Sequence, residues 1–302
     1  MMLSNISNKL DVVTINLTHN SEVNGLVYIC HGMSEHVRRY HWFIDQLNKD
    51  GFHVVAIDHR GHGRWIENGF QEGVFAQKNG WDLVTNDLLN LISSTNADYP
   101  NINHYLFAHS MGSFIALSAI QKELKLSGLI LSASTKTSSL LSTIQVLVIK
   151  IITLINGRAS KSKFFDSLTM RTFNNKFSPS RTPNDWISTD PENVDDYTND
   201  PLCGFIASNG VWLDMANSFQ TIFNKKMYPS SNLNIPILII SGDEDPVGEN
   251  GKGVARLYKF LKNIFYNVEY ILLKNERHEI LSGISKQLSY NNIKEFLLKN
   301  QF

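Results

Sequence analysis

Short runs of β-branched and aliphatic residues alternate along this chain with longer stretches of helical periodicity. The central runs are almost continuously apolar, which is typical of strands buried on both faces of a sheet. Strands that alternate with helices predict an α/β fold with a mostly parallel central sheet and helices on both faces. The predicted strands are Asp11–Leu17 at an edge, then Leu26–Cys30, His53–Asp58, His104–Ala108, Gly128–Ala133, Pro236–Ser241 and Val268–Leu273. The predicted helices between them are Trp42–Lys49, Trp81–Ser94, Gly112–Leu124, Gly251–Leu261 and Lys286–Lys299.

One long interval, residues 134–234, interrupts this alternation because it contains no buried-strand run. It holds helical stretches at Leu140–Asn156, Lys161–Asn175 and Val211–Asn224, with a polar, proline-bearing loop between the last two. An insertion of this size between two core strands predicts a helical cap. We therefore expect an α/β core of residues 1–133 and 235–302 and a cap, or lid, of residues 134–234.

Charge and apolar patterning narrow the classes of partner and location. Lys plus Arg and Asp plus Glu each total 28, so the formal net charge is zero. We expect no nucleic-acid partner, because such binders usually carry a basic excess. Residues 1–5 lack the pattern of a signal peptide, and the apolar stretch Leu140–Ile155 is short and carries Lys150, so no transmembrane helix is predicted. We expect a cytoplasmic protein, with peripheral membrane contact left open.

The two cysteines, Cys30 and Cys203, are far apart and form no Cys-x-x-Cys pair. Neither a disulfide scaffold nor a cysteine-based metal site is therefore predicted. The run Asp58-His-Arg-Gly-His-Gly63 brings histidine and aspartate together, but its spacing matches no zinc signature. We interpret it as a structural loop held by hydrogen bonds, and we expect no metal.

The sharpest chemical signal is Ala108-His109-Ser110-Met111-Gly112, which follows a predicted strand and precedes a predicted helix. That context is the one a nucleophile elbow requires. The turn is strained, so small residues must flank the serine. Gly112 meets this need on one side, and Ala108 replaces the commoner glycine on the other. A serine that merely caps the helix is the simpler alternative, and the strand and helix around it favour the nucleophile.

A serine nucleophile needs a base, and the base needs an orienting acid. In this fold the chain order is Ser, acid, His, and Asp245 and His278 follow Ser110 in that order. Each lies just beyond a predicted strand, where α/β sheets place catalytic groups. Asp243 and Glu244 are neighbouring candidates for the acid. We prefer Asp245 because it lies furthest past the strand, and we interpret the other two as solvated loop charges.

An acyl-transfer reaction also needs hydrogen-bond donors for the oxyanion of its intermediate. One predicted donor is the backbone N–H of Met111, the residue after the nucleophile. The second predicted donor is the backbone N–H of Met33, in the loop that follows the strand ending at Cys30. Gly32 lets that backbone turn close to the site, although an ordinary glycine turn would look the same. His31 is interpreted as a structural residue of this loop.

Five ordered blocks resemble the monoglyceride lipase and lysophospholipase group of α/β-hydrolases, which is also called serine aminopeptidase-like. They are His31-Gly-Met-Ser-Glu-His36 with Tyr40, Asp58-His-Arg-Gly-His-Gly63, His109-Ser-Met-Gly112, Gly242-Asp-Glu-Asp-Pro-Val247 and Arg277-His-Glu-Ile-Leu281. The resemblance implies the α/β-hydrolase fold, the triad Ser110, Asp245 and His278, the donors Met33 and Met111, and a helical cap. Ala108 and the pair Arg64-Trp65 depart from the usual pattern, and neither removes a catalytic group.

The mechanism expected from these residues is a two-step acyl transfer on Ser110, without a metal or organic cofactor. The expected substrate is a small-molecule ester or lipid: a monoacylglycerol, a lysophospholipid or a similar carboxylic ester. The apolar residues that begin the cap either pack on the core, or part of their face lines an acyl tunnel or touches lipid surfaces transiently. They are Leu140, Leu141, Ile144, Leu147, Val148, Ile151, Ile152 and Ile155.

Two alternatives remain open at this point. One is a proline-releasing aminopeptidase or another small-ester hydrolase; the peptidase would bind a free amine through acidic cap residues such as Asp190 and Asp200. The other is a non-catalytic binding protein on the same scaffold, which is disfavoured because all three triad residues are present in order. The sequence does not determine the oligomeric state.

Overall fold

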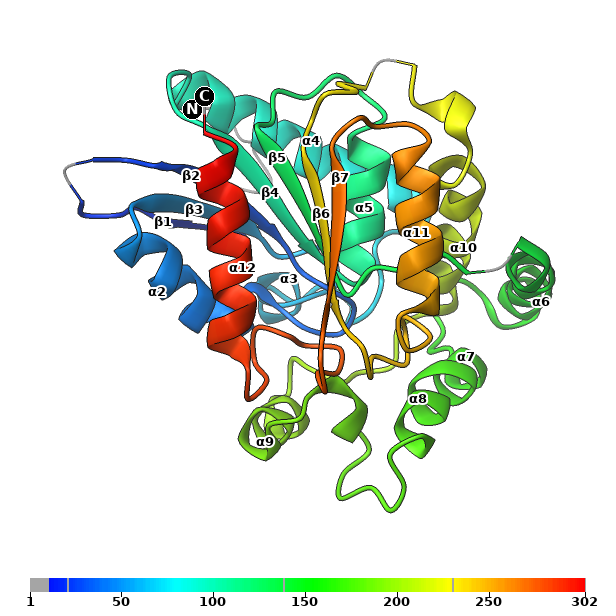
Figure 1. Cartoon of the computed structure of the whole chain (residues 1–302). Coiled ribbons are helices and arrows are strands. Elements are labelled where there is room, and N and C mark those ends of the chain that lie inside the picture. Colours follow the sequence, from blue (N-terminus) through cyan, green and yellow to red (C-terminus); the bar gives the residue numbers. More distant parts are fainter. Residues whose placement is uncertain (1–10, 21, 138, 230, 302) are drawn as a thin grey trace.

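The computed structural model describes residues 11–20, 22–137, 139–229 and 231–301, and over residues 139–145 it describes the backbone alone. Its centre is a seven-stranded sheet in the order β1-β3-β2-β4-β5-β6-β7, in which only β1 is antiparallel to its neighbour (Figure 1). The mostly parallel α/β sheet is therefore confirmed. The strands are β1 (Val13–Asn16), β2 (Gly25–Cys30), β3 (Phe52–Ile57), β4 (His104–His109), β5 (Gly128–Ser132), β6 (Ile237–Gly242) and β7 (Val268–Leu273).

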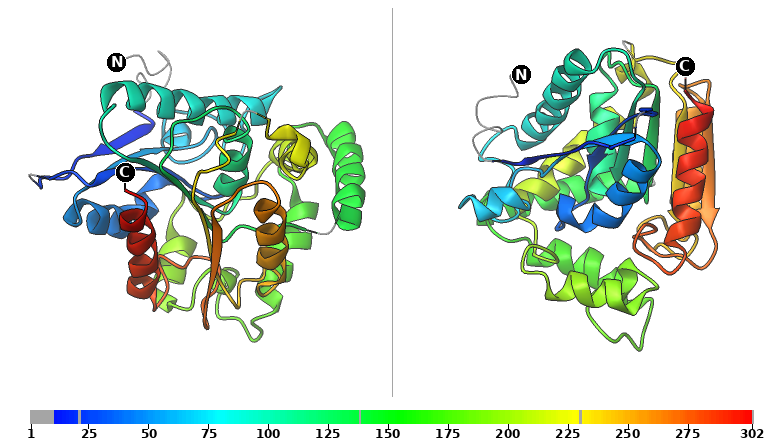
Figure 2. Two further views of the ribbon diagram at one scale, coloured as in Figure 1. Left: turned by 45° about the horizontal axis from the view of Figure 1, so that its top comes forward. Right: turned by 90° about the vertical axis from the view of Figure 1, so that its left-hand side faces the viewer.

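Side chains of the inner strands alternate between two apolar cores, one on each face of the sheet. In β2, for example, Tyr28 and Cys30 enter one core while Val27 and Ile29 enter the other. This two-sided burial explains why the inner strands are almost continuously apolar in sequence. The first core is covered by α4 (Gly80–Asp98), α5 (Met111–Ala119), α10 (Asn209–Ile222) and α11 (Lys252–Lys262), and the second by α2 (His41–Lys49) and α12 (Lys286–Lys299) (Figures 1 and 2).

The chain between β5 and β6 is helical, as the sequence indicated. Its bounds are α6 (Ser139–Asn156), α7 (Lys163–Asp166), a π-helical turn at Ser167–Arg171, α8 (Thr172–Asn175), a 3-10 turn at Asp185–Ile187, α9 (Pro191–Asn199), then α10 and a 3-10 turn at Lys225–Met227. Outside it lie the short α3 (Arg64–Glu67) and a 3-10 turn at Val37–Tyr40. Within the described residues, no helix is long and apolar enough to cross a membrane.

The prediction of a loop throughout the proline-bearing stretch is wrong over α9. Asp190 caps this helix by accepting a hydrogen bond from the backbone N–H of Glu192 (3.0 Å), and Pro191 occupies the first turn. Both are standard signals of a helix start. Val194 and Tyr197, three residues apart, are the buried side chains of α9, and they join a small apolar core with Trp186.

Helix α10 packs differently from the rest of the inserted chain. Its Phe219 ring lies 4.8 Å from the ring of Phe114 on α5, and its Val211 belongs to the main core beneath the sheet. Part of the predicted cap is therefore built into the helical layer of the core. The division of the chain into a core and a cap at residues 134–234 stays a prediction.

Candidate active site

Ser110 lies in the tight turn between the last residue of β4, His109, and the first residue of α5, Met111. Its backbone has φ 49° and ψ −120°, a conformation that a residue with a side chain rarely adopts. A side chain at Gly112 would place its Cβ 2.3 Å from the carbonyl oxygen of Cys30, so this close approach of α5 to the end of β2 requires glycine. Ala108 is fully buried in regular β4 pairing, where its methyl group replaces the commoner glycine inside the core.

Three side chains from three separate strand ends form one line of hydrogen bonds. His278 Nε2 lies 3.0 Å from Ser110 Oγ, and His278 Nδ1 lies 3.0 Å from Asp245 Oδ2 and 3.1 Å from Asp245 Oδ1. Asp245 and His278 are buried, and Ser110 is partly accessible. These distances suit transfer of a proton from the serine to the imidazole, with the carboxylate holding the Nδ1–H.

The two acidic neighbours of Asp245 lie in different surroundings. Asp243 is half-buried, and its Oδ1 accepts the backbone N–H of Asn275 at 2.7 Å. Glu244 is also half-buried, whereas Asp245 is fully buried and accepts the backbone N–H of Val247 at 2.9 Å. Of the three carboxylates, Asp245 is therefore the one that faces His278.

The surroundings of His278 determine its basicity. Burial alone would lower the pKa of His278, but the charge and hydrogen bond of the Asp245 carboxylate, aided by Glu279 and Glu35, raise that pKa above its ordinary value of 6.5. His109, whose ring centroid lies 4.8 Å from that of His278, has its pKa lowered well below 6.5 by burial and by repulsion from His278. His109 is therefore a neutral neighbour, and His278 is the stronger base.

The predicted oxyanion donors lie on the two segments that border Ser110. Met111 is buried at the first turn of α5, where backbone N–H groups lack partners within the helix. Met33 is in the loop His31–His36, which we call the oxyanion loop. A Cβ built on Gly32 would lie 3.2 Å from Ser110 Cβ, so the backbone of this loop passes directly beside the serine.

Glu35 is a buried residue of the oxyanion loop that the sequence analysis did not single out. Its Oε1 accepts the backbone N–H of Gly32 and, at 2.8 Å, the hydroxyl hydrogen of Tyr40. Burial, followed by repulsion from Glu279, raises the pKa of Glu35 to about 7. The signal available in the sequence was a carboxylate, Glu35, three residues after Gly32 at the end of a strand. The local sequence does not show that the Glu35 side chain bends back to bind the Gly32 N–H.

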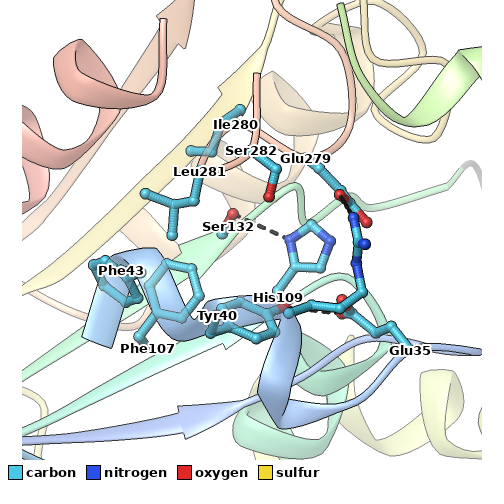
Figure 3. Close-up of a pocket in the computed structure, with 11 residues that line it drawn as sticks. Glu35, Tyr40, Phe43, Phe107, His109, Ser132, Glu279, Ile280, Leu281 and Ser282 are labelled. Atoms are coloured by element: carbon cyan, nitrogen blue, oxygen red, sulfur yellow. Dashed lines mark hydrogen bonds and ion pairs between the residues drawn. The ribbon is translucent and has the colours of Figure 1, made fainter. Parts of the chain in front are cut away.

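A small cavity lies beside Glu35 and His109 (Figure 3). Arg39 lines it and forms a 2.7 Å ion pair with Glu279, and the cavity also borders Phe107 and Ser132. Its volume of about 20 Å³ corresponds to little more than one water molecule, so it is too small for an acyl chain.

Trp186 is a second residue near the site that the sequence analysis missed. Its ring centroid lies 5.0 Å from that of His278, and it comes from the inserted chain. The loop carrying His278 is tied to the same segment, because Glu279 donates its backbone N–H to the Ile187 carbonyl (2.6 Å) and Arg277 donates to the Ser188 carbonyl (3.0 Å). A tryptophan within a polar stretch was the signal available in the sequence.

The other histidines near the site make structural hydrogen bonds. His31 Nε2 accepts the backbone N–H of His59 at 3.0 Å, and Asp58 Oδ1 accepts that of Val37 at 2.9 Å. Burial lowers the pKa of His59 to about 3 and that of His62 to about 4, so both are neutral. These contacts support the interpretation of Asp58–Gly63 as a structural loop.

Among the described residues, His36, Asp200 and Cys203 have potential metal-ligating atoms within 4.8 Å of one another. His36 Nε2 and Asp200 Oδ2 are already joined by a hydrogen bond of 2.8 Å. Burial raises the pKa of the Cys203 thiol, which keeps it in the protonated form that binds metals poorly. The contacts in this group are therefore those of a side-chain hydrogen bond beside a thiol.

The sheet, the strained serine turn and the three strand-end side chains together define an α/β-hydrolase. The family model described as serine aminopeptidase, S33, matches residues 21–283, and the chain belongs to this family. A monoglyceride lipase of Rattus norvegicus is 25% identical over 274 residues, covering 87% of this chain and 80% of the relative. A monoacylglycerol lipase of Mycolicibacterium smegmatis is 24% identical over 230 residues, covering 76% and 72%.

Solved structures show the same architecture. A thermostable carboxyl esterase from Bacillus coagulans, solved in complex with glycerol, superposes with a TM-score of 0.83 at 28% identity. The match covers 95% of this chain and 92% of the esterase. A lipase in an open form superposes with a TM-score of 0.84 at 24% identity, covering 95% and 93%.

Proposed function

We propose that this protein is a serine hydrolase of carboxylic esters in which Ser110 is the nucleophile, His278 the base and Asp245 the orienting acid. The observation that carries the proposal is the hydrogen-bonded line from Ser110 Oγ through His278 to the buried Asp245 carboxylate. A serine hydroxyl is a weak nucleophile by itself, and this arrangement is the one that activates it. The proposed mechanism uses no cofactor.

The reaction proceeds in two acyl-transfer steps. Ser110 Oγ attacks the ester carbonyl while His278 Nε2 takes its proton, and the backbone N–H groups of Met33 and Met111 stabilise the oxyanion. His278 then returns the proton to the departing alcohol, which leaves Ser110 acylated. In the second step, water gives its proton to His278, attacks the acyl carbonyl and releases the acid, and Ser110 regains its proton.

Monoacylglycerols and lysophospholipids are the proposed substrates. Monoacylglycerols are supported by the names of the relatives, which include monoglyceride and monoacylglycerol lipases, and by the esterase solved with glycerol. Lysophospholipids are proposed because they carry the same kind of acyl ester.

A substrate panel tests the class of reaction. The purified protein is assayed on p-nitrophenyl esters of increasing acyl length, on 1-monooleoylglycerol, on lysophosphatidylcholine and on proline β-naphthylamide. We expect hydrolysis of the esters with an optimum at a medium or long acyl chain, and no release of naphthylamine. Cleavage of the proline amide in preference to the esters would favour the aminopeptidase. Cleavage of none of them would favour a binding protein on this scaffold.

We also propose that the protein works in the cytoplasm and touches lipid surfaces transiently through α6. The described side chains of α6 divide into two groups: Val146 and Ile149 are buried, whereas Leu147, Ile151 and Leu154 are 61%, 51% and 86% exposed. An exposed apolar helix face of this kind suits a membrane interface. The side chains of Leu140, Leu141 and Ile144 lie outside the described residues, so α6 supports surface contact more directly than an acyl tunnel.

The double variant Ile151→Glu, Leu154→Glu tests the contact with lipid. Replacing these two apolar side chains by glutamate should weaken binding to phosphatidylcholine vesicles at least about a hundredfold, since each apolar side chain buried in the membrane interface contributes roughly 1.5–3 kcal/mol. Hydrolysis of a short, soluble p-nitrophenyl ester should stay within twofold. Ile284→Glu is the matched control, because Ile284 is 73% exposed just before α12, and α12 and α6 lie on opposite sides of the molecule in Figure 1. Equal vesicle binding by the double variant and the native protein would contradict the proposal.

A further inference from the structure

The oxyanion loop, His31–His36, is held from one side by the core of the protein. Glu35 accepts the backbone N–H of Gly32, and the carboxylate of Glu35 is itself held by the Tyr40 hydroxyl at 2.8 Å. These bonds fix the first half of the loop, which runs beside Ser110. They leave the peptide units after Met33 to be fixed by other contacts.

The inserted chain holds the second half of the same loop. The carbonyl oxygen of Ser34 accepts two hydrogen bonds, from the backbone N–H of Gly204 (2.9 Å) and from the hydroxyl of Tyr197 (3.1 Å). The hydroxyl of Ser34 donates to the carbonyl of Phe205 at 2.7 Å. We call residues Tyr197–Phe205, which begin in the last turn of α9, the clamp segment.

A side-chain pair joins the same two segments. His36 Nε2 lies 2.8 Å from Asp200 Oδ2, and His36 is only 3% exposed. The other carboxylate oxygen of Asp200 accepts the backbone N–H of Leu202 at 2.8 Å, so one residue both shapes the clamp segment and binds the loop. The Asp200 side chain is 29% exposed, and its carboxylate makes this a charge-assisted hydrogen bond, which is stronger than one between neutral groups.

The loop adopts a conformation that needs this support. Ser34 has φ 57°, the left-handed region that costs a residue with a side chain roughly 1–2 kcal/mol. The N–H of Met33 lies between Gly32, which the core holds, and Ser34, which the clamp segment holds. The direction of that N–H therefore depends on contacts from both parts of the chain.

We propose that the clamp segment sets the position of the Met33 N–H, with Asp200 and Tyr197 acting as positioning residues that couple the seating of the inserted chain to catalysis. This inference rests on the proposed function, because it assumes that the Met33 N–H stabilises the oxyanion. A clamp segment that moves away releases the Ser34 carbonyl and the His36 side chain together. The enzyme then keeps its triad but loses part of its stabilisation of the intermediate.

Kinetics on a short, soluble ester test the proposal in the full-length protein. Asp200→Ala should lower kcat about tenfold and Tyr197→Phe about threefold, each with KM within twofold, because a misplaced donor weakens the transition state more than the bound substrate. Asp200→Asn should stay within about twofold of the native protein, since an amide can still bond both His36 and the Leu202 N–H.

Inhibition by an alkyl trifluoromethyl ketone separates positioning from general damage. Ser110 adds to this ketone and gives a hemiketal whose oxygen occupies the oxyanion site, so its inhibition constant should rise by the same factor by which kcat/KM falls. Arg181→Ala and Tyr266→Phe are the matched controls: Arg181 pairs with Asp195 on α9, and Tyr266 is 65% exposed. Both controls should keep native kinetics.

The outcomes separate this proposal from the one on which it rests. If the native protein hydrolyses esters but Tyr197→Phe and Asp200→Ala keep the native kcat, the clamp is wrong and the proposed function stands. A lower kcat with an unchanged inhibition constant would also overturn it, because the donor would then be in place. Failure of the native protein on every ester, with no labelling of Ser110 by a fluorophosphonate, would overturn both.

Discussion

Replacing Ser110 with alanine should lower kcat for ester hydrolysis on the order of 10⁶-fold, which means to the background of most assays. This is the scale of loss seen when the nucleophile of a serine triad is removed. The physical reason is that the proposed acyl-enzyme forms on Ser110 Oγ, which lies 3.0 Å from the base, His278 Nε2. Alanine has no atom that could carry the acyl group. The fold should survive, because the change removes one hydroxyl from a partly accessible position and takes away a single hydrogen-bond partner, that of His278 Nε2.

The measurement combines kinetics with labelling of the nucleophile. A fluorophosphonate probe should modify the native protein at one serine, and mass spectrometry of the labelled peptide should place the adduct on Ser110. Ser118→Ala is a suitable control, because Ser118 lies on the same helix and its oxygen only accepts a hydrogen bond from Trp81 at 2.9 Å. A Ser110→Ala protein that still turns over esters at a tenth of the native rate would exclude Ser110 as the nucleophile.

The fold could be predicted from sequence because its determinants are local and repeated. Each inner strand must fill a core on both faces, so runs such as Leu26–Cys30 and His104–Ala108 are apolar without alternation. Because the apolar runs mark where the strands end, the positions of the candidate catalytic residues could be predicted as well. Ser110, Asp245 and His278 all follow apolar runs whose carboxyl ends lie at one edge of a parallel sheet.

What escaped prediction depends on contacts between residues far apart in the chain. Trp186, which belongs to the inserted chain, lies beside the ring of His278. The carbonyl oxygen of Ser34 accepts hydrogen bonds from Gly204 and Tyr197. No periodicity or spacing encodes such pairs, since each partner is an ordinary residue of its own segment. Helix α9 is a different case. The sequence Asp190-Pro191-Glu192 is a recognisable helix start, but the polar composition of the segment indicated a loop. The helix is stabilised by the burial of a few side chains such as Tyr197.

Replacing Asp245 with asparagine should lower kcat by about 10⁴-fold, the loss that follows when a triad imidazole is held in the wrong tautomer. The carboxylate accepts from His278 Nδ1 at 3.0 Å, and an amide that donates there would leave Nε2 carrying the proton. The residual activity should also change its pH dependence. Burial lowers the pKa of His278 and the Asp245 charge raises it, so loss of that charge lowers the pKa and moves the acidic limb of kcat/KM to lower pH.

Asp243→Asn is the matched control, and it decides which of the neighbouring carboxylates is the catalytic acid. The Asp243 Oδ1 accepts the backbone N–H of Asn275 at 2.7 Å, a bond that an amide oxygen also makes, so activity should stay within threefold and the acidic limb should not move. Glu244→Gln should behave in the same way. Because all three variants remove one negative charge within three consecutive residues, a general electrostatic effect would lower their activities alike. A loss confined to Asp245→Asn therefore requires direct contact between this carboxylate and His278. A loss in Asp243→Asn as large as that in Asp245→Asn would contradict the assignment of Asp245 as the catalytic acid.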